Sequence, residues 1–243
     1  MRKWMITTLV IGAVLVSYHQ VRGSDQDMEN DMQMKPNMTR EAVFAGGCFW
    51  CTEADLEKVD GVIEVVSGYT GGKEVDPTYE QVSSGRTGHV EAVRVIYDPE
   101  KISYKELLHV FWRTINPTDD GGQFVDRGPQ YRSAIFYTNE EQRRLAEASK
   151  RALAASGPFE KPIVTEIRPL EAFYPAEDYH QDYYDHNPIR YKWYRSGSGR
   201  DRYLEKTWDT KEPWKAMQAD MQDQNAEKTR SAAANTPHTI PSD

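Results

Sequence analysis

Residues 41–58 read EAVFAGGCFWCTEADLEK and contain both cysteines of the 243-residue chain, Cys48 and Cys51. The first five of these residues have strand character, and the strand is predicted to end at Gly46-Gly47. The residues from 48 to 58 have helical character, so Cys48 is predicted in the first turn of a helix. The free N–H groups and the positive end of the helix dipole would favour a thiolate there. The stretch therefore predicts a strand–turn–helix unit that presents a reactive thiol.

More strands and helices alternate along the chain after this unit. Strands are predicted at residues 62–68, 89–97, 132–138 and 163–170, and helices at residues 103–115 and 139–156. Ser103, with Glu106 three residues on, forms a capping-box pattern. Asn139 is suited to cap the later helix, which Gly157-Pro158 would stop. This order favours an α/β (α+β) fold, namely a two-layer sandwich on a small mixed β-sheet with a ferredoxin-like core.

The two ends of the chain differ in composition from its middle. Residues 1–23 are typical of a secretory signal peptide, because a basic start precedes an apolar run shorter than the ~20 residues of a membrane span. An uncleaved N-terminal anchor is the alternative. Residues 24–39 are polar and lack periodicity, which indicates a linker, and residues 40–209 suffice for one domain with a core. Residues 210–243 predict a largely disordered tail with one short helix around 214–221. We therefore expect an exported protein, periplasmic or extracellular.

Charge and cysteine usage exclude several classes of function. The formal net charge is −8, and no basic cluster or aromatic–basic interleaving occurs, which argues against nucleic acid as a partner. A disulfide across two intervening residues would constrain the chain little, because the stabilisation grows with loop length. A zinc site needs about four ligands, and the six histidines are scattered. The cysteine pair is better explained as a redox device than as a structural disulfide, and we expect no metal.

Two bulky aromatic side chains, Phe49 and Trp50, stand between the cysteines. Beside a thiol they would form an apolar cup of the size of a methyl group or a short thioether. The alternative is that both are core residues of the helix. We expect one to lie in the core and the other to line a site, while the two glycines leave room for a ligand to approach the sulfur.

Four stretches resemble the successive signatures of one enzyme family, the type A peptide methionine sulfoxide reductases. They are GGCFWCTEADLEKVDGVIEVVSGYTGG (46–72), PTYEQVSSGRTGHVEAVRVIYDP (77–99), FVDRGPQYRSAIFYT (124–138) and AEDYHQDYY (176–184). The resemblance runs over residues 41–208, so it implies that residues 40–209 form the catalytic domain. It implies an oxidoreductase that reduces the S epimer of methionine sulfoxide, free or in oxidised proteins.

The resemblance also implies roles for individual residues. Cys48 matches the family's nucleophile, and Glu91 matches its proton donor. A sulfoxide oxygen leaves only when it is protonated, and burial would raise the pKa of Glu91 enough to keep a proton near neutral pH. Tyr79 and Tyr131 match the tyrosines that hold the sulfoxide oxygen. Asp126 matches a carboxylate that binds the substrate's backbone amide or a water.

Cys51 departs from the commonest family pattern, which has a small residue there and resolving cysteines in a glycine-rich tail. This chain has no cysteine in its tail, so the resemblance is to the subgroup with both cysteines in the GCFWC motif. It implies that Cys48 becomes a sulfenic acid, that Cys51 closes a disulfide, and that an external thioredoxin-type dithiol reopens it. No bound cofactor is implied, and we expect a monomer. His89, His180, Gln181 and Asp178 are expected to be supporting residues.

Two other functions compete with this interpretation. A thiol–disulfide oxidoreductase would explain a C-x-x-C pair after a strand, but would leave Glu91, Asp126 and Tyr131 without a role. A non-enzymatic exported binding module with an aromatic groove would bind its ligand equally well without the cysteines.

Overall fold

The computed structural model of the protein describes residues 39–212 and Lys215. The elements in chain order are β1 (Arg40–Gly46), α2 (Phe49–Leu56), β2 (Val62–Thr70), α3 (Tyr79–Ser83), β3 (Val90–Tyr97), α4 (Tyr104–Thr114), β4 (Gly122–Gln123), β5 (Asp126–Arg127), η1 (Pro129–Tyr131), β6 (Ser133–Tyr137), α5 (Glu140–Ser156), β7 (Glu166–Pro169), β8 (Phe173–Pro175), η2 (Asp178–His180), α6 (Tyr183–His186), α7 (Pro188–Gly197) and α8 (Arg200–Trp208). The predicted signal peptide, the predicted linker up to residue 38 and the predicted tail helix (apart from Lys215) lie outside the described residues.

The main sheet has six strands in the order β7-β6-β1-β3-β2-β8. Pairing is antiparallel except between β6 and β7, which are parallel, so the sheet is mixed as predicted. The four inner strands follow the order β6-β1-β3-β2, with α2 between β1 and β2 and α4 between β3 and β6 along the chain. This β-α-β-β-α-β arrangement is the ferredoxin-like core that the sequence predicted.

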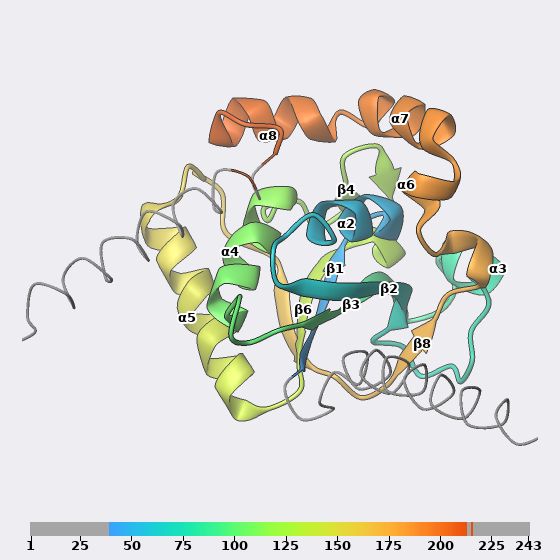
Figure 1. Ribbon diagram of the computed structural model, residues 1–243, viewed down its shortest axis with the longest axis horizontal. Coiled ribbons are helices and arrows are strands. Elements are labelled where there is room, and N and C mark those ends of the chain that lie inside the picture. Colours follow the sequence, from blue (N-terminus) through green and yellow to red (C-terminus); the bar gives the residue numbers. More distant parts are fainter. Residues whose placement is uncertain (1–38, 213–214, 216–243) are drawn as a thin grey trace, which may run out of the picture. The chain divides into compact units, whose positions relative to one another are not determined.

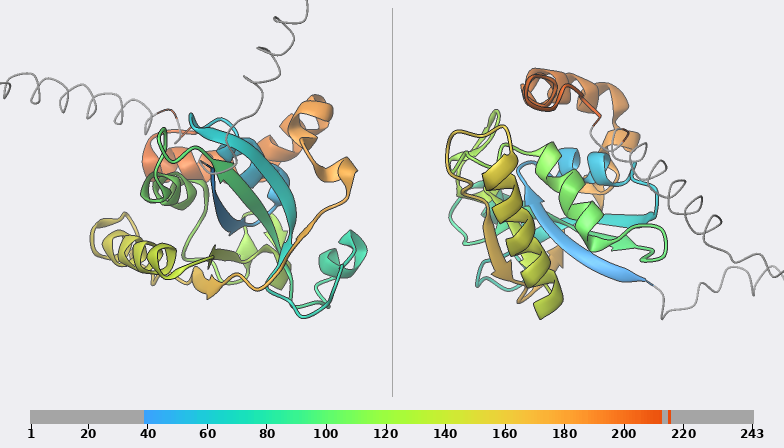
Figure 2. Two further views of the ribbon diagram at one scale, coloured as in Figure 1. Left: turned by 60° about the horizontal axis from the view of Figure 1, so that its bottom comes forward. Right: turned by 90° about the vertical axis from the view of Figure 1, so that its left-hand side faces the viewer.

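Three helices, α2, α4 and α5, cover one face of the sheet (Figure 1). In the core between the layers, Phe44 of β1 stacks on Phe111 of α4 with ring centroids 4.8 Å apart. The views of Figure 2 show α4 and α5 side by side on that face. A smaller apolar cluster on the other face includes Val43 and Phe136, with Leu170 and Phe173 packed against it. Strands β1 and β3 are consequently buried on both faces.

The helix boundaries follow the local signals in the sequence. The capping box of Ser103 and Glu106 is present at the start of α4, and the Asn139 side chain accepts a hydrogen bond from the Gln142 N–H at the start of α5. Helix α5 ends at Gly157, as predicted.

Helices α7 and α8 were not predicted, and they pass over α2 (Figure 1). They are attached through charged side chains: Arg195 of α7 forms a buried ion pair with Asp55 of α2, and Arg200 of α8 donates hydrogen bonds to main-chain carbonyls beneath it. Within the described part of the chain, no helix has the length and apolar character needed to cross a membrane.

Candidate active site

The turn between β1 and α2 requires glycine. Gly47 has a φ of +87°, and a Cβ there would lie 2.5 Å from the Gln123 side chain and 3.2 Å from the Arg200 guanidinium. The turn ends at Cys48, which occupies the N-cap position of α2. The Gly46-Gly47 pair therefore lets the chain turn within two residues and sets Cys48 at the start of the helix, as the sequence predicted.

A pocket of about 130 Å³ opens at Cys48. At roughly 30 Å³ for one water in the liquid, this volume accommodates about four non-hydrogen atoms, the size of a methyl sulfoxide group. The side chains that line it are Cys48, Phe49, Trp50, Tyr79, Glu91, Asp126, Tyr131 and Tyr194. The structure thus brings together every predicted site residue except Cys51, and adds Tyr194, which the sequence analysis missed.

Glu91 is the buried acid of this pocket. Its exposed fraction is 2%, and its Oε2 accepts a 2.9 Å hydrogen bond from the Phe49 main-chain N–H. Burial, and then the Asp126 carboxylate, raise the pKa of Glu91 to about 8, although the Phe49 N–H acts in the opposite direction. Near neutral pH the carboxyl group therefore holds a proton that it can donate to a substrate.

Tyr79 and Tyr131 supply neutral hydroxyl groups to the same pocket. Burial and the nearby Glu91 raise the pKa of Tyr79 to about 12, and the same causes raise the pKa of Tyr131 further. Tyr79 is held in place by its main-chain N–H, which donates to Glu177 Oε1 at 2.9 Å, and by the His180 ring, 4.4 Å away. Both hydroxyls can therefore donate hydrogen bonds to an oxygen bound between them.

Asp126 forms a short contact with Tyr194, which the sequence analysis did not predict as a site residue. The Tyr194 hydroxyl donates a 2.6 Å hydrogen bond to Asp126 Oδ2. Burial raises the pKa of Asp126, and the Tyr194 hydrogen bond, together with the Arg200 charge, opposes that rise. The carboxylate thus stays available as an acceptor at the pocket's edge.

Both aromatic residues of the GCFWC motif line the pocket. Phe49 is 1% exposed and also belongs to the main core, whereas Trp50 is only partly buried. Trp50 stacks on Tyr183 with centroids 3.7 Å apart, and its Nε1 donates to His180 Nδ1 at 3.1 Å. The expectation of one core residue and one pocket residue was therefore wrong for Phe49, which is both. His180 is a supporting residue, as predicted.

The state of the Cys48 thiol differs from the sequence-based expectation of an exposed thiolate. Cys48 is 6% exposed, and burial raises the pKa of its thiol well above the usual range. A hydrogen bond to Cys51 and the Glu91 and Asp126 carboxylates act in the same direction. The helix N-terminus does not overcome desolvation and two acidic neighbours. The thiol is therefore protonated at rest.

Cys51 is 1% exposed and does not line the pocket. It follows Cys48 by one turn, with its N–H 3.2 Å from the Cys48 carbonyl oxygen. The hydrogen bond from Cys48 lowers the pKa of Cys51, and Arg200 and Arg195 lower it further. These contacts favour ionisation of the Cys51 thiol over that of Cys48.

The sequence analysis missed the residues that α7 and α8 bring to the thiols, namely Tyr191, Tyr194, Arg195 and Arg200. Their only signal was the density of tyrosine and arginine in YKWYRSGSGR (191–200).

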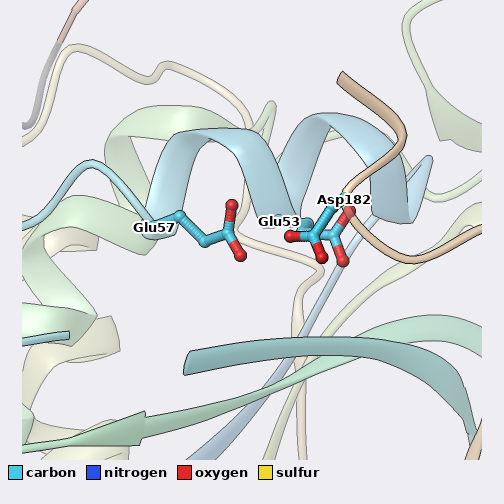
Figure 3. Close-up of side chains that lie close together, drawn as sticks. All are labelled: Glu53, Glu57 and Asp182. Carbon is cyan, nitrogen blue, oxygen red and sulfur yellow. The ribbon is translucent and has the colours of Figure 1, made fainter. Parts of the chain in front are cut away.

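A second group of titratable residues, from α2, its C-cap and the N-cap of α6, lies away from this pocket. One carboxylate oxygen from each of Glu53, Glu57 and Asp182 lies within 4.8 Å of the others (Figure 3). Burial raises the pKa of Glu53 to about 8 and that of Glu57 to about 7. Three carboxylates could coordinate a hard cation such as Ca²⁺ or Mg²⁺, but the cation would have to displace these protons. Glu53 also accepts a hydrogen bond from the Ser67 hydroxyl, so these groups serve the packing of α2 without any ion.

Comparisons with known proteins agree with this site. A family model described as peptide methionine sulfoxide reductase matches residues 40–212. The chain is 56% identical over 167 residues to the peptide methionine sulfoxide reductase MsrA of Halalkalibacterium halodurans, which covers 69% of this chain and 95% of that protein. It is 54% identical over 166 residues (68% of this chain) to MsrA/MsrB of Vibrio cholerae, and the match spans 44% of that relative's length. The crystal structure of reduced Mxr1 from Saccharomyces cerevisiae is similar, with a TM-score of 0.60, 32% identity, and coverage of 64% of this chain and 89% of that one. The predicted resemblance to the family and the predicted fold class are confirmed, while the subgroup with both cysteines in the GCFWC motif stays a prediction.

Proposed function

The chain belongs to the peptide methionine sulfoxide reductase family, and we propose that it reduces the S epimer of methionine sulfoxide, in proteins and free. The observation that carries this proposal is the pocket at Cys48. A thiol, a carboxyl group that is protonated near neutral pH and two neutral tyrosine hydroxyls line one cavity of methyl sulfoxide size. These are the nucleophile, the acid and the hydrogen-bond donors that sulfoxide reduction needs.

In the first step, the substrate's methyl group packs on Phe49 and Trp50, and its oxygen faces Glu91 and the tyrosine hydroxyls. The Cys48 sulfur attacks the sulfoxide sulfur while Glu91 gives its proton to the oxygen, and the proton released by the Cys48 thiol replaces it on Glu91. The oxygen is transferred to Cys48, so that thiol and sulfoxide become sulfenic acid and methionine. The thiol is oxidised and the substrate reduced by two electrons.

In the second step, the Cys51 sulfur displaces the hydroxyl group of the Cys48 sulfenic acid. A sulfur–sulfur bond forms, the sulfur–oxygen bond breaks, and the oxygen leaves as water. An external dithiol of the thioredoxin type then reduces the disulfide by thiol–disulfide exchange. This sequence needs no bound cofactor.

Stereochemical selectivity follows from three different surroundings for the three groups on the sulfoxide sulfur. The methyl group takes the aromatic wall, the oxygen takes the donors, and the rest of the substrate extends past Asp126. Exchanging two groups would place the oxygen on the aromatic wall without a hydrogen bond, which is costly for a polar group. The pocket therefore favours a single epimer, and family membership indicates that it is the S epimer.

Two further parts of the proposal rest on the sequence. The basic and apolar start of the chain supports export to the periplasm or outside the cell, or anchoring in the membrane by the N-terminus. Oxidised proteins there would be the substrates of a monomeric repair enzyme.

The test is turnover of the two resolved epimers of a methionine sulfoxide peptide with dithiothreitol as reductant. We expect methionine to form from the S epimer alone. Equal rates on both epimers would contradict the assignment to type A.

A further inference from the structure

The resolving thiol occupies surroundings of its own, outside the substrate pocket. Cys51 is 1% exposed, and the charges that act on it come from α7 and α8, which pass over α2 (Figure 1). Arg195 of α7 and Arg200 of α8 both lower the pKa of its thiol. The two helices thus surround the second thiol with positive charge, while their contribution to the substrate pocket is Tyr194.

Arg195 is neutralised by carboxylates. Its Nη1 lies 3.0 Å from Asp55 Oδ2, and its Nε lies 2.6 Å from Asp201 Oδ1. These ion pairs use its charge to attach α7 to α2. Arg195 therefore offers little positive charge to a thiolate.

Arg200 differs in having no such partner. Its exposed fraction is 1%, and within the described residues no carboxylate lies within the 4.0 Å of an ion pair. Its Nη1 and Nη2 donate to the carbonyl oxygens of Thr114 and Gly46, at 2.6 and 2.9 Å. Its guanidinium lies over the Phe124 ring, 4.6 Å from the centroid. A buried cation with only neutral partners is costly, so it is expected where a negative charge forms.

The position of this cation matches the forming charge. Arg200 Nη2 would lie 3.2 Å from a Cβ at Gly47, so the guanidinium lies under the turn that leads into Cys48. Its hydrogen bond to the Gly46 carbonyl oxygen holds the same turn. The cation thus lies against the turn that leads into Cys48, and two carbonyl oxygens and the Phe124 ring hold it there.

We propose that Arg200 is a positioning residue of the resolving step: its unpaired guanidinium stabilises the Cys51 thiolate that attacks the Cys48 sulfenic acid. This inference rests on the proposed function. In the step, the Cys51 sulfur supplies the electron pair of the new sulfur–sulfur bond, and hydroxide leaves Cys48 and takes up a proton to become water. Cys51 is oxidised and the Cys48 sulfur is reduced.

Other ionisable groups also face Cys51 or Arg200, and they have to be weighed against the Arg200 charge. They are Cys48 at the N-cap of α2, Asp55 on α2, Glu91 on β3, Asp126 on β5, Tyr191, Tyr194 and Arg195 on α7, and Arg200 on α8. The tyrosines are neutral because burial raises their pKa values, Glu91 is protonated near neutral pH, and Asp55 is paired with Arg195. Asp126 also interacts with the Arg200 charge, but within the described residues no ion pair joins the two, so Arg200 is the cation left to face a thiolate at Cys51.

The test compares Arg200→Gln with Arg200→Lys in a single turnover without reductant. Both variants lose the planar fork that holds two carbonyls, but only lysine keeps the charge. Three quantities are measured over a pH series: the methionine burst, the dimedone-reactive sulfenic acid, and the loss of free thiols as the disulfide closes. Arg202→Met, at an exposed arginine of the same helix, is the control.

We expect both variants to give the full methionine burst. In Arg200→Gln, disulfide closure should slow by at least about tenfold, the effect of one pKa unit, and its pH profile should move to higher pH. Arg200→Lys should retain the native pH profile, and Arg202→Met should behave as the native protein.

Equal slowing in both Arg200 variants with an unchanged pH profile would show that Arg200 only clamps the fold, and would overturn the inference. If Arg200→Gln does not fold, Arg200→Lys decides alone: disulfide closure at the native rate with a native pH profile supports the inference, and slowed closure or a shifted profile contradicts it. Absence of a burst from the unmodified protein would instead contradict the proposed function itself.

Discussion

The main-chain N–H of Phe49 donates a 2.9 Å hydrogen bond to Glu91 Oε2. This bond connects the first residue of α2 to the buried strand β3. Because the amide uses Oε2 as its acceptor, the proton of the neutral acid resides on Oε1. The peptide bond between Cys48 and Phe49 therefore fixes the nucleophile and the acid relative to each other.

Replacement of this acid by its amide should slow the chemistry without weakening binding. Glu91→Gln keeps an acceptor for the Phe49 N–H but has no proton to give. The chemical step should slow by roughly 10²–10⁴-fold at neutral pH, with little change in substrate affinity. Single-turnover methionine release at saturating and limiting substrate measures both quantities.

The matched control is Glu53→Gln. Glu53 is also buried, and burial raises its pKa to about 8 as well, but it does not line the pocket. Its variant should react at nearly the native rate. If the rate of the chemical step falls by less than tenfold in Glu91→Gln, the acid must instead be a tyrosine or a water molecule.

The pKa of Glu91 also predicts a pH-dependent cost in stability. The usual value of 4.5 rises to about 8 in the folded protein, so the folded state keeps a proton that the unfolded chain releases. The stabilisation by this proton is complete below pH 4.5 and is lost as the pH rises through 8. Glu91→Gln cannot ionise, so at pH 9 it should be more stable than the native protein, by about 4 kcal/mol, and at pH 4.5 nearly equally stable. Thermal unfolding at the two pH values measures this, and a less stable variant at pH 9 would refute it.

Local signals were sufficient for much of the fold. The turn at Gly46-Gly47 and the helix starts at Ser103 and Asn139 are short-range features, and they appear where the sequence predicted them. The pocket residues were predicted through the family resemblance rather than from spacing. Glu91 alone, as an acidic residue within a strand, is typical of a solvated position. Only the burial of β3 on both faces makes it an acid.

The sequence-based predictions that failed concern features that depend on tertiary packing. A thiolate was predicted for Cys48 from its helix position, but its pKa is set by burial and by carboxylates from β3 and β5, which are distant in sequence. Helices α7 and α8 escaped prediction because an arginine is buried on each, beside only one fully buried leucine, Leu204 of α8. Arg195 and Arg200 point inward, while Ile189 and Trp193 are 82% and 84% exposed. This reverses the apolar pattern by which amphipathic helices are identified.

The hydroxyl group of Tyr194 should matter for substrate binding. Tyr194→Phe keeps the edge-on contact with Trp50 but removes the 2.6 Å hydrogen bond to Asp126. The pKa of Asp126 should then rise, because that bond opposes the effect of burial. We expect KM for a methionine sulfoxide peptide to rise about tenfold at neutral pH, as for the loss of a hydrogen bond to a charged group, with a smaller change in kcat.

The control for this prediction is Tyr203→Phe, which removes a hydroxyl that donates to Asn116 Oδ1 at 3.1 Å outside the pocket. Its KM should stay native. A fall in kcat at constant KM in Tyr194→Phe would show instead that Tyr194 acts on the reacting oxygen.

The two cysteines should fail at different steps, because only Cys48 lines the pocket and Cys51 is enclosed beside it. Cys48→Ser should release no methionine at all. Cys51→Ser should release about one methionine per enzyme and keep a sulfenic acid on Cys48 that dimedone traps. Turnover with a thioredoxin-type reductant should then stop, since no disulfide forms for it to open, whereas a small thiol should restore slow turnover by attacking the sulfenic acid directly. Burst size without reductant is the measurement, and a burst from Cys48→Ser, or full thioredoxin-driven turnover by Cys51→Ser, would reverse the roles assigned to the two thiols.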